Sequence, residues 1–298
     1  MKALVIGEIL WDIIDGVPHL GGAPLNLAAH LAKMGDEVTV LSAVGNDELG
    51  ARALERAASF GIDTSCIAID SGRPTGTVDV FVDDAGQPDY TIHEDVAYDA
   101  IKLDDEQFRT LTGSVWDVIY LGTVAQRGAS NREIIRRLLQ TARRNQLFYD
   151  VNLRKNCFTT RIVERTLLVS TMVKLNDDEA DMLAREFFGG AMPVEATARR
   201  LLESFGLEVV IVTRGSKGAY LHSAASSTYT ATEDVPIVDT VGAGDSFSAA
   251  FLHTYHRAGA TGGNLHESGR VASALADFVV TRAGAIPDYP ASITQLFS

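Results

Sequence analysis

The amino-acid sequence predicts an α/β fold in which a largely parallel sheet is covered by helices on both faces. Short apolar runs alternate with amphipathic helical stretches along most of the chain, as in βαβ units. With 298 residues, of which 46% are hydrophobic, the chain can bury one large core, although its length also permits two domains. One stretch interrupts the alternation with a period of two. We therefore expect a single domain over residues 1–298 with a small β appendage.

The first sixty residues contain two repeats of a strand followed by a helix. Pro24 suits the first turn of a helix, in which Leu27 and Leu31 recur at helical spacing until Gly35 can end it. Leu10–Leu20, which precedes this helix, is predicted to be irregular. The other elements are strands over Lys2–Glu8 and Glu37–Val44 and a helix over Glu48–Phe60. This order of elements predicts parallel strands.

Thr75–Ile92 is the stretch that departs from the alternation. Val78, Val80 and Val82 alternate with other residues in a first run, and the turn residues Asp83–Gly86 separate it from a second run, Asp89–His93. This pattern predicts a β-hairpin, and an isolated hairpin is only marginally stable in water. We therefore expect residues 10–20 and 75–98, approximately, to form a small sheet over the strand ends. It would act as a lid, as a homodimer contact through Val78, Val80 and Val82, or as both.

After Asp104 the alternation of strands and helices resumes. Strands are predicted at Asp117–Leu121, Leu147–Val151, Met172–Leu175, Glu208–Thr213, Gly218–His222 and Tyr229–Val238, with the last two antiparallel. Helices are predicted at Asn131–Arg143, Thr160–Val169, Asp177–Phe187, Pro193–Phe205, Ala243–Arg257 and Glu267–Arg282. Two helices therefore close the domain after the last strand.

The charge and the cysteine content narrow the class of protein. A net charge of -13 and a pI near 4.9 argue against a nucleic-acid or anionic-membrane partner, because both require clustered Lys and Arg. The N-terminal residues read as a strand without a signal-peptide pattern, and no apolar run has the length of a transmembrane helix. Cys66 and Cys157 are too few for a disulfide framework or a zinc cluster. We expect a cytoplasmic protein with reduced thiols.

The stretch Asp239–Phe247 carries the strongest functional signal. It joins the last predicted strand to a helix that begins near Ala243, and Gly242 and Gly244 let a ligand approach the backbone. The first N–H groups of a helix, together with the helix dipole, favour a bound anion. Asp245 in this first turn is a candidate general base beside a phosphate site. An acid there can equally serve only to complement the dipole.

Other polar clusters follow predicted strands, where ligands bind in open α/β sheets. Arg154, in the segment Asp150–Arg154, can hold a phosphate or a sugar hydroxyl, or it can form a surface salt bridge. Asn176 and Glu179 have the spacing of a capping box, and Glu179 can alternatively position Mg²⁺ through its bound waters. Thr213–Gly218 has the small residues that a nucleotide site needs, although a tight turn explains the segment equally well.

Two candidates for a sugar site lie near the N-terminus. Gly21 and Gly22 open the first helix, so that Asn26 can point toward a ligand bound against Gly22. Asp12 follows the first strand and is either an acceptor for sugar hydroxyls or a solvated loop acid.

Several common motifs are absent from the sequence. There is no Walker-type phosphate loop, no Gly-x-Gly-x-x-Gly after the first strand and no Gly-x-Ser-x-Gly elbow. The seven histidines show no metal-ligand spacing. These absences argue against a P-loop nucleotidase, a nicotinamide oxidoreductase and an α/β-hydrolase.

The order of the remaining motifs resembles one family over essentially the whole chain. The sequence resembles the phosphofructokinase-B or ribokinase-like sugar kinases in four motifs and in their order. The motifs are Gly21-Gly22-Ala23-Pro24-x-Asn26, Asn176-x-x-Glu179, Thr213-x-Gly215-x-x-Gly218 and Asp239-Thr240-x-Gly242-Ala243-Gly244-Asp245-x-Phe247. The resemblance implies a three-layer α/β/α sandwich with a small β lid, MgATP as donor and a sugar or nucleoside hydroxyl as acceptor. The segments Gly21–Asn26 and Asp150–Arg154 are most similar to those of fructokinases.

The resemblance also implies roles for individual residues. Asp245 would be the base, and the backbone of Gly242, Ala243 and Gly244 would stabilise the transferred phosphoryl group. The sugar would contact a group of polar and glycine positions: Asp12, Gly21, Gly22, Asn26 and Arg154. The nucleotide would border Thr213, Gly215, Gly218 and the helix segment that contains Ser273. Asp239 and Val241, with the turn at Ala283–Ala285, would hold a monovalent cation such as K⁺, a role that Lys or water can also fill.

The acceptor stays open at this point. A fructokinase is the leading interpretation, and a 2-keto-3-deoxygluconate kinase, a ribokinase or a nucleoside kinase are alternatives. An acidic substrate would need a second cation besides Arg154, whereas a nucleoside would need a stacking partner such as Trp11, Phe81, Tyr90 or Tyr98. A non-catalytic regulator that binds sugar or nucleotide on the same fold is the alternative from another class.

Overall fold

The computed structural model describes residues 1–82, 88–259 and 264–297 and contains a large, mostly parallel sheet. The order of its strands is β13-β12-β11-β10-β9-β8-β1-β4-β5, and only the β11–β12 and β12–β13 pairs are antiparallel. These strands are β1 (Lys2–Ile6), β4 (Glu37–Gly45), β5 (Ile67–Asp70), β8 (Val115–Gly122), β9 (Arg143–Asp150), β10 (Met172–Asn176), β11 (Val209–Thr213), β12 (Ala219–Ser223) and β13 (Ser227–Thr230).

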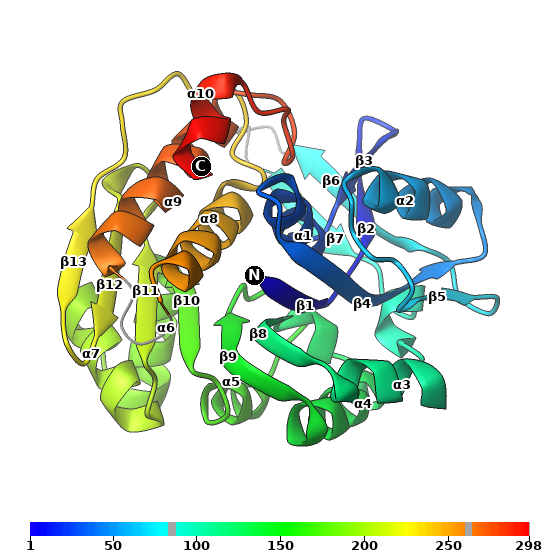
Figure 1. Ribbon diagram of the computed structural model, residues 1–298, viewed down its shortest axis with the longest axis horizontal. Coiled ribbons are helices and arrows are strands. Elements are labelled where there is room, and N and C mark those ends of the chain that lie inside the picture. Colours follow the sequence, from blue (N-terminus) through cyan, green and yellow to red (C-terminus); the bar gives the residue numbers. More distant parts are fainter. Residues whose placement is uncertain (83–87, 260–263, 298) are drawn as a thin grey trace.

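Helices cover both faces of this sheet and complete three α/β/α layers (Figure 1). One face packs against α1 (Ala23–Lys33), α2 (Glu48–Ser59), α8 (Ala243–Arg257) and α9 (Leu265–Val280). The other packs against α3 (Asp105–Gly113), α4 (Ala129–Thr141), α5 (Thr160–Leu167), α6 (Asp177–Phe188) and α7 (Val194–Phe205). Because successive strand residues point to opposite faces, β1 sends Ala3 and Val5 to the first face and Leu4 and Ile6 to the second. The predicted fold class is confirmed.

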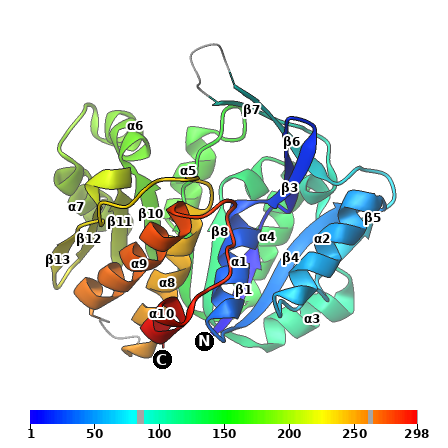
Figure 2. The same cartoon turned by 90° about the horizontal axis from the view of Figure 1, so that it is seen from above.

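A second, four-stranded sheet stands out from the body of the molecule (Figure 2). Its order is β3-β2-β6-β7, formed by β2 (Leu10–Ile14), β3 (Val17–Gly21), β6 (Gly76–Val82) and β7 (Pro88–Ile92). The prediction that Leu10–Leu20 is irregular was wrong. Asp15 and Gly16 both have positive φ, at 50° and 77°, and they join β2 to β3 in a two-residue hairpin turn. The Asp-Gly pair is a strong sequence signal for this turn.

The small sheet is anchored to the body through its base. Val78 is buried in an apolar cluster with Leu10 and Tyr98, so its side chain packs on the domain. Arg127 donates a hydrogen bond to the Asp99 carboxylate, at 2.7 Å, and another to the backbone oxygen of His93. The predicted turn at 83–86 and the side chains of Val80 and Val82 lie outside the described residues.

Several elements differ from the prediction. The strand expected to run to Val238 ends at Thr230, and the exposed Val235–Val238 segment is a loop whose end is held by hydrogen bonds to the Val280 backbone oxygen. Pro236 has no N–H to donate to a ladder, which disfavours a strand there. Arg143 begins β9 instead of ending α4. Strand β5 and helix α3 were not predicted. The remaining elements are short: α10 (Ala291–Thr294) and the 3₁₀ turns η1 (Ala97–Ala100), η2 (Val124–Gln126), η3 (Gly215–Lys217) and η4 (Gln295–Phe297).

None of the helices within the described ranges combines the length and the hydrophobicity that crossing a bilayer requires.

Candidate active site

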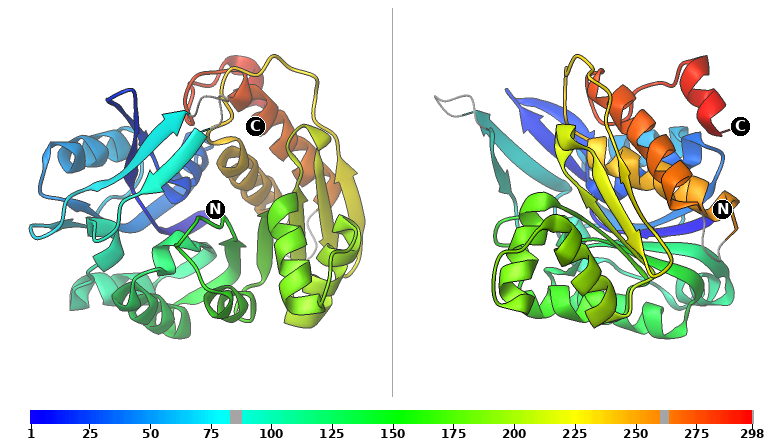
Figure 3. Two further views of the ribbon diagram at one scale, coloured as in Figure 1. Left: turned by 180° about the vertical axis from the view of Figure 1, so that it is seen from behind. Right: turned by 90° about the vertical axis from the view of Figure 1, so that its left-hand side faces the viewer.

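The N-termini of α1 and α8 meet at the carboxyl ends of the central strands, near the base of the small sheet (Figure 3). Asp245, in the first turn of α8, accepts a hydrogen bond of 2.8 Å from the side-chain amide of Asn26 in α1. Burial raises the pKa of the Asp245 carboxyl to about 6, against the opposing effects of the Lys174 charge and of the Asn26 hydrogen bond. A carboxyl in this state can take up a proton close to neutral pH.

The backbone at the start of α8 has free hydrogen-bond donors. The amide groups of Gly242, Gly244 and Asp245 have no acceptor among the residues that the structure describes. Gly242 has a φ of 79°, and a Cβ there would lie 2.6 Å from the Cβ of Ala285, so only glycine fits. These amides and the helix dipole form a site for an anionic group next to the Asp245 carboxylate.

A buried ion pair lies beneath this turn. Lys174 of β10 donates to both carboxylate oxygens of Asp150 in β9, each at 3.1 Å, and Tyr120 donates to the same carboxylate at 3.3 Å. A Cβ at Gly244 would be 3.0 Å from the Lys174 ammonium nitrogen, which places this positive charge directly under the α8 N-terminus. The charge of Lys174 also lowers the pKa of Asp245. Lys174 therefore adds positive charge to the anion site.

Two further acids and one arginine share this region. Burial raises the pKa of the Glu8 carboxyl to about 7, and its Oε2 atom has no hydrogen-bond partner within the described part of the chain. Burial also raises the pKa of Asp12, whereas the charge of Arg154 lowers it. The charge of Arg154 also lowers the pKa values of Glu8 and of Asp245. The structure thus brings Asp12, Asn26, Arg154 and Asp245 of the predicted site together.

The paired glycines allow close contacts in this region. A Cβ at Gly21 would lie 2.5 Å from an Asp12 carboxylate oxygen, and one at Gly22 would lie 2.5 Å from the Glu8 backbone oxygen. Gly22 also has a φ of 107° as the N-cap of α1. The two glycines therefore bring β3 close to Asp12 of β2 and the start of α1 close to the Glu8 backbone after β1.

The residues predicted to border a nucleotide lie along the neighbouring strand ends. Thr213 ends β11 and pairs in register with Asn176, which ends β10. Gly215, which begins η3, and Gly218, which follows it, have positive φ, and Ser273 is buried within α9. No hydrogen bond between described residues joins this group to Asp245.

The predicted metal ligands have structural partners. Asn176 and Glu179 form a capping box, and Glu179 accepts a second backbone hydrogen bond of 2.7 Å from Leu153. The Asp239 carboxylate accepts hydrogen bonds from the amides of Val241 and Gly284, each at 3.0 Å. Within the described ranges, no three His, Cys, Asp or Glu side chains are grouped as ligands for a metal ion.

Sequence reasoning missed Glu8, Asp150 and Lys174 as members of this site. Two of them carried a signal, because Lys174 interrupts an apolar strand that is buried on both faces and Glu8 lies two residues after another such strand. Lys174 is a cation beneath the α8 N-terminus, and it is paired with Asp150.

Two of the four expected stacking partners are buried in other contacts. Trp11 is 5% exposed and donates to the Leu49 backbone oxygen, and Tyr98 is fully buried with its hydroxyl bonded to Arg127. The side chains of Phe81 and Tyr90 lie outside the described residues.

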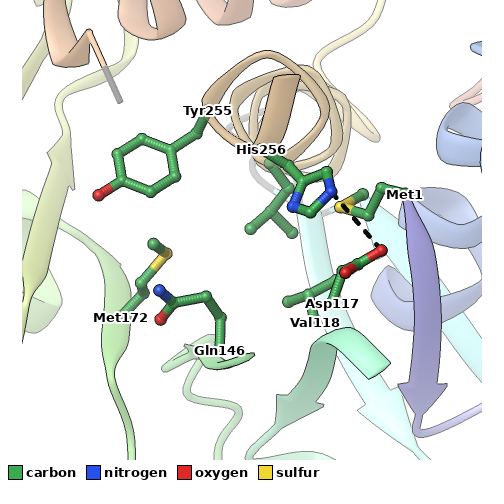
Figure 4. Close-up of a pocket in the computed structure, with 8 residues that line it drawn as sticks. Met1, Asp117, Val118, Gln146, Met172, Tyr255 and His256 are labelled. Atoms are coloured by element: carbon green, nitrogen blue, oxygen red, sulfur yellow. Dashed lines mark ion pairs between the residues drawn. The ribbon is translucent and has the colours of Figure 1, made fainter. Parts of the chain in front are cut away.

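A small pocket at the opposite ends of the strands is unsuited to a substrate. It lies among Met1, Asp117, Met172 and His256, near the C-terminal end of α8, where His256 and Asp117 form an ion pair of 3.6 Å (Figure 4). Its volume of about 10 Å³ is of the size of one water molecule.

Comparisons with known proteins agree with this arrangement. Residues 13–292 match the sequence model described as pfkB family carbohydrate kinase. The chain is 26% identical over 309 residues to fructokinase-1 of Zea mays, covering 97% of this chain and 95% of that protein. It is 25% identical over 263 residues to a fructokinase of Klebsiella pneumoniae, covering 84% and 83%.

A solved structure has the same fold. The crystal structure of a fructokinase with bound ATP from Xylella fastidiosa superposes with a TM-score of 0.84 at 20% identity, covering 99% of this chain and 97% of that one. The family match spans most of the chain, and the structural match spans nearly all of it. The protein is therefore a phosphotransferase that belongs to the pfkB family of carbohydrate kinases.

Proposed function

We propose that this carbohydrate kinase transfers the γ-phosphoryl group of ATP to a hydroxyl of fructose. The observation that carries the proposal is the Asp245 carboxylate, held by Asn26 at 2.8 Å beside amide groups that lack an acceptor within the described part of the chain. A base and an anion site in direct contact are what phosphoryl transfer to a hydroxyl requires.

Asp245 takes up the proton of the acceptor hydroxyl. Its raised pKa of about 6 still leaves the carboxylate ionised at neutral pH, and it makes the group a better proton acceptor than an ordinary aspartate. The amides of Gly242 and Gly244, with the Lys174 charge beneath them, stabilise the negative charge of the transferring group. General-base assistance typically contributes about 10²–10⁴ in rate, and alignment and charge stabilisation contribute the remainder.

The residues present fit a nucleoside triphosphate with its Mg²⁺. The amides without acceptors in the described part of the chain leave hydrogen-bond donors at the α8 N-terminus for phosphate oxygens. Thr213, Gly215, Gly218 and Ser273 would border the nucleotide, whose γ-phosphate supplies the transferred group when ATP is bound. Mg²⁺ usually keeps several bound waters and takes its other ligands from the substrate phosphates. Asn176 and Glu179 would position those waters.

The acids around Asp245 support a neutral polyol as acceptor. Asp12, Glu8 and Asn26 offer hydrogen-bonding groups for sugar hydroxyls. An acidic sugar would face these carboxyls, while Lys174 is already paired with Asp150. Arg154 is the cation that would orient the sugar. The burial of Trp11 and Tyr98 leaves a nucleoside without these two stacking partners.

The test is a coupled assay of ADP release with MgATP and one acceptor at a time: fructose, ribose, glucose, 2-keto-3-deoxygluconate, adenosine and inosine. We expect fructose to have the highest kcat/KM. A higher kcat/KM with another acceptor would make that acceptor the substrate in place of fructose, and the proposed phosphoryl transfer would still stand. ATP and sugar binding without ADP release from any acceptor would favour the non-catalytic regulator. Repeating the assay in K⁺ and in Na⁺ at constant ionic strength tests the cation role of Asp239 and Val241.

A further inference from the structure

A groove with a volume of about 1060 Å³ lies between α4 and α5, on the face of the large sheet opposite α8. These two helices follow neighbouring strands and lie on the same side of the sheet (Figure 3). The volume is at the upper end of the range of small-molecule sites. Asp245, Asn26 and Lys174 do not line it, so the groove is separate from the active site.

The groove divides the core on this face into two parts. One apolar cluster lies beneath α3 and α4 and contains Ile135 and Leu138, whereas a separate cluster beneath α5, α6 and α7 contains Val163 and Leu167. At the end of the groove, the hydroxyl of Thr166 donates to the side-chain oxygen of Gln126 at 3.0 Å. Elsewhere the walls of the groove carry charged side chains at positions where adjacent helices ordinarily pack together.

The charged side chains along the groove are almost all arginines. They are Arg127, Arg132, Arg136, Arg144, Arg161 and Arg165, and Glu133 is the one carboxylate among the lining residues of the described chain. This concentration of positive charge is unexpected in a chain with a net charge of -13. Glu133 is occupied by a bidentate ion pair with Arg136.

Several of these arginines lack an anionic partner. Arg161 and Arg165 lie exposed on α5 and make no ion pair or hydrogen bond through their side chains with any described residue. Arg132 donates to two backbone oxygens, and Arg144 donates to the Leu139 backbone oxygen. Burial lowers the pKa of the Arg144 guanidinium. The groove therefore holds more cations than the chain neutralises.

We propose that this groove binds a small organic anion that carries two or more phosphate or carboxylate groups. Guanidinium groups bind both kinds of oxyanion in a bidentate manner, and the arginines on opposite walls can contact separate groups of one ligand. Leu139, Phe158 and Ile162 offer apolar surface for its carbon portion. The site is distinct from the phosphate position at the start of α8.

The test is calorimetric titration of the full-length protein with pyrophosphate, citrate and fructose 1,6-bisphosphate, each with and without saturating ADP. The three probes separate phosphate from carboxylate recognition. We expect at least one probe to bind with a stoichiometry of one in the presence of ADP, because ADP occupies the active site and not the groove. The double variant Arg161→Gln/Arg165→Gln should weaken this binding at least tenfold.

The matched control is Arg109→Gln/Arg199→Gln, which removes two exposed arginines from α3 and α7 and changes the net charge equally. Control binding should stay within twofold of the wild type. The proposal is overturned if no probe binds, if ADP displaces every bound probe, or if the two double variants bind equally. Catalytic turnover without probe should be unchanged in both variants, which separates this result from the proposed kinase reaction.

Discussion

The side-chain amide of Asn26 donates a hydrogen bond of 2.8 Å to the carboxylate of Asp245, across 219 positions of the chain. Each residue lies in the first turn of a helix whose N-cap is a glycine with positive φ, Gly22 in α1 and Gly242 in α8. Both helices therefore direct their positive ends toward one carboxylate, which favours its ionised form. This contact links the N-terminal and C-terminal motifs into one site.

Replacing Asn26 by Ala should move the acidic limb of the pH-rate profile to higher pH. The hydrogen bond from Asn26 lowers the pKa of Asp245, so its loss raises that pKa above about 6 and leaves less carboxylate at pH 6. Loss of a charge-assisted hydrogen bond of about 1.5 kcal/mol would raise the pKa by about one unit and lower kcat at pH 6 by roughly sevenfold. Asn145→Ala, which removes a hydrogen bond to Asp117 at the other end of the sheet, is the control. An unshifted limb in Asn26→Ala would contradict the coupling.

Replacing Gly242 by Ala should lower kcat by roughly 10², the typical effect of losing one oxyanion donor. The added Cβ would lie 2.6 Å from Ala285 and would displace the turn that presents the amides. Gly259→Ala is the matched control, because Gly259 has a similar φ of 92° but no atom within 4 Å of the added Cβ. Steady-state kinetics should show normal kcat in the control. Equal kcat in both variants would mean that the Gly242 amide does not hold the phosphoryl group.

Replacing Lys174 by Met should destabilise the protein by about 3–5 kcal/mol, because it leaves the buried Asp150 carboxylate without its partner. The double variant Lys174→Met/Asp150→Leu should recover most of that loss. Urea denaturation measures the free energy of unfolding of both variants. Turnover should stay low in the double variant, since the positive charge beneath Gly244 is still missing. Restored turnover in the double variant would show that Lys174 has a purely structural role.

Replacing Glu8 by Gln should stabilise the protein at alkaline pH and not at acidic pH. The folded-state pKa of Glu8 is raised from 4.5 to about 7, so the folded state binds more protons than the unfolded state between these values. The free energy of unfolding of the wild type therefore falls as the pH rises from about 4.5 to 7.

Above pH 8 the Glu8→Gln gain should be on the order of 3 kcal/mol, and at pH 4 it should vanish. Urea denaturation at both pH values measures it, with Glu55→Gln on the exposed face of α2 as the control. A gain of the same size at both pH values would show that packing, and not ionisation, is responsible.

Local sequence signals predicted the parts of the fold and the site that depend on neighbouring residues. Pro24, Gly22 and Gly242 mark the starts of two helices, and the positions of Asn26 and Asp245 follow directly from those starts. The Val235–Val238 run was misassigned because strand propensity does not show whether a partner strand is present. Lys174 was missed because its role depends on Asp150, which lies 24 positions away in a neighbouring strand. The arginines of the groove lie on separate elements and meet only in the folded chain.

The most direct test of the active site is turnover of Asp245→Asn, measured as ADP release with MgATP and fructose beside calorimetric binding of each ligand. The amide keeps the size of the side chain but cannot accept the proton. We predict that kcat falls by about 10²–10⁴ while the dissociation constants for nucleotide and sugar stay within a few-fold. Asp15→Asn, in the exposed β2–β3 turn, should behave as the wild type. Near-normal turnover of Asp245→Asn, with both ligands bound, would contradict the assignment of Asp245 as the base.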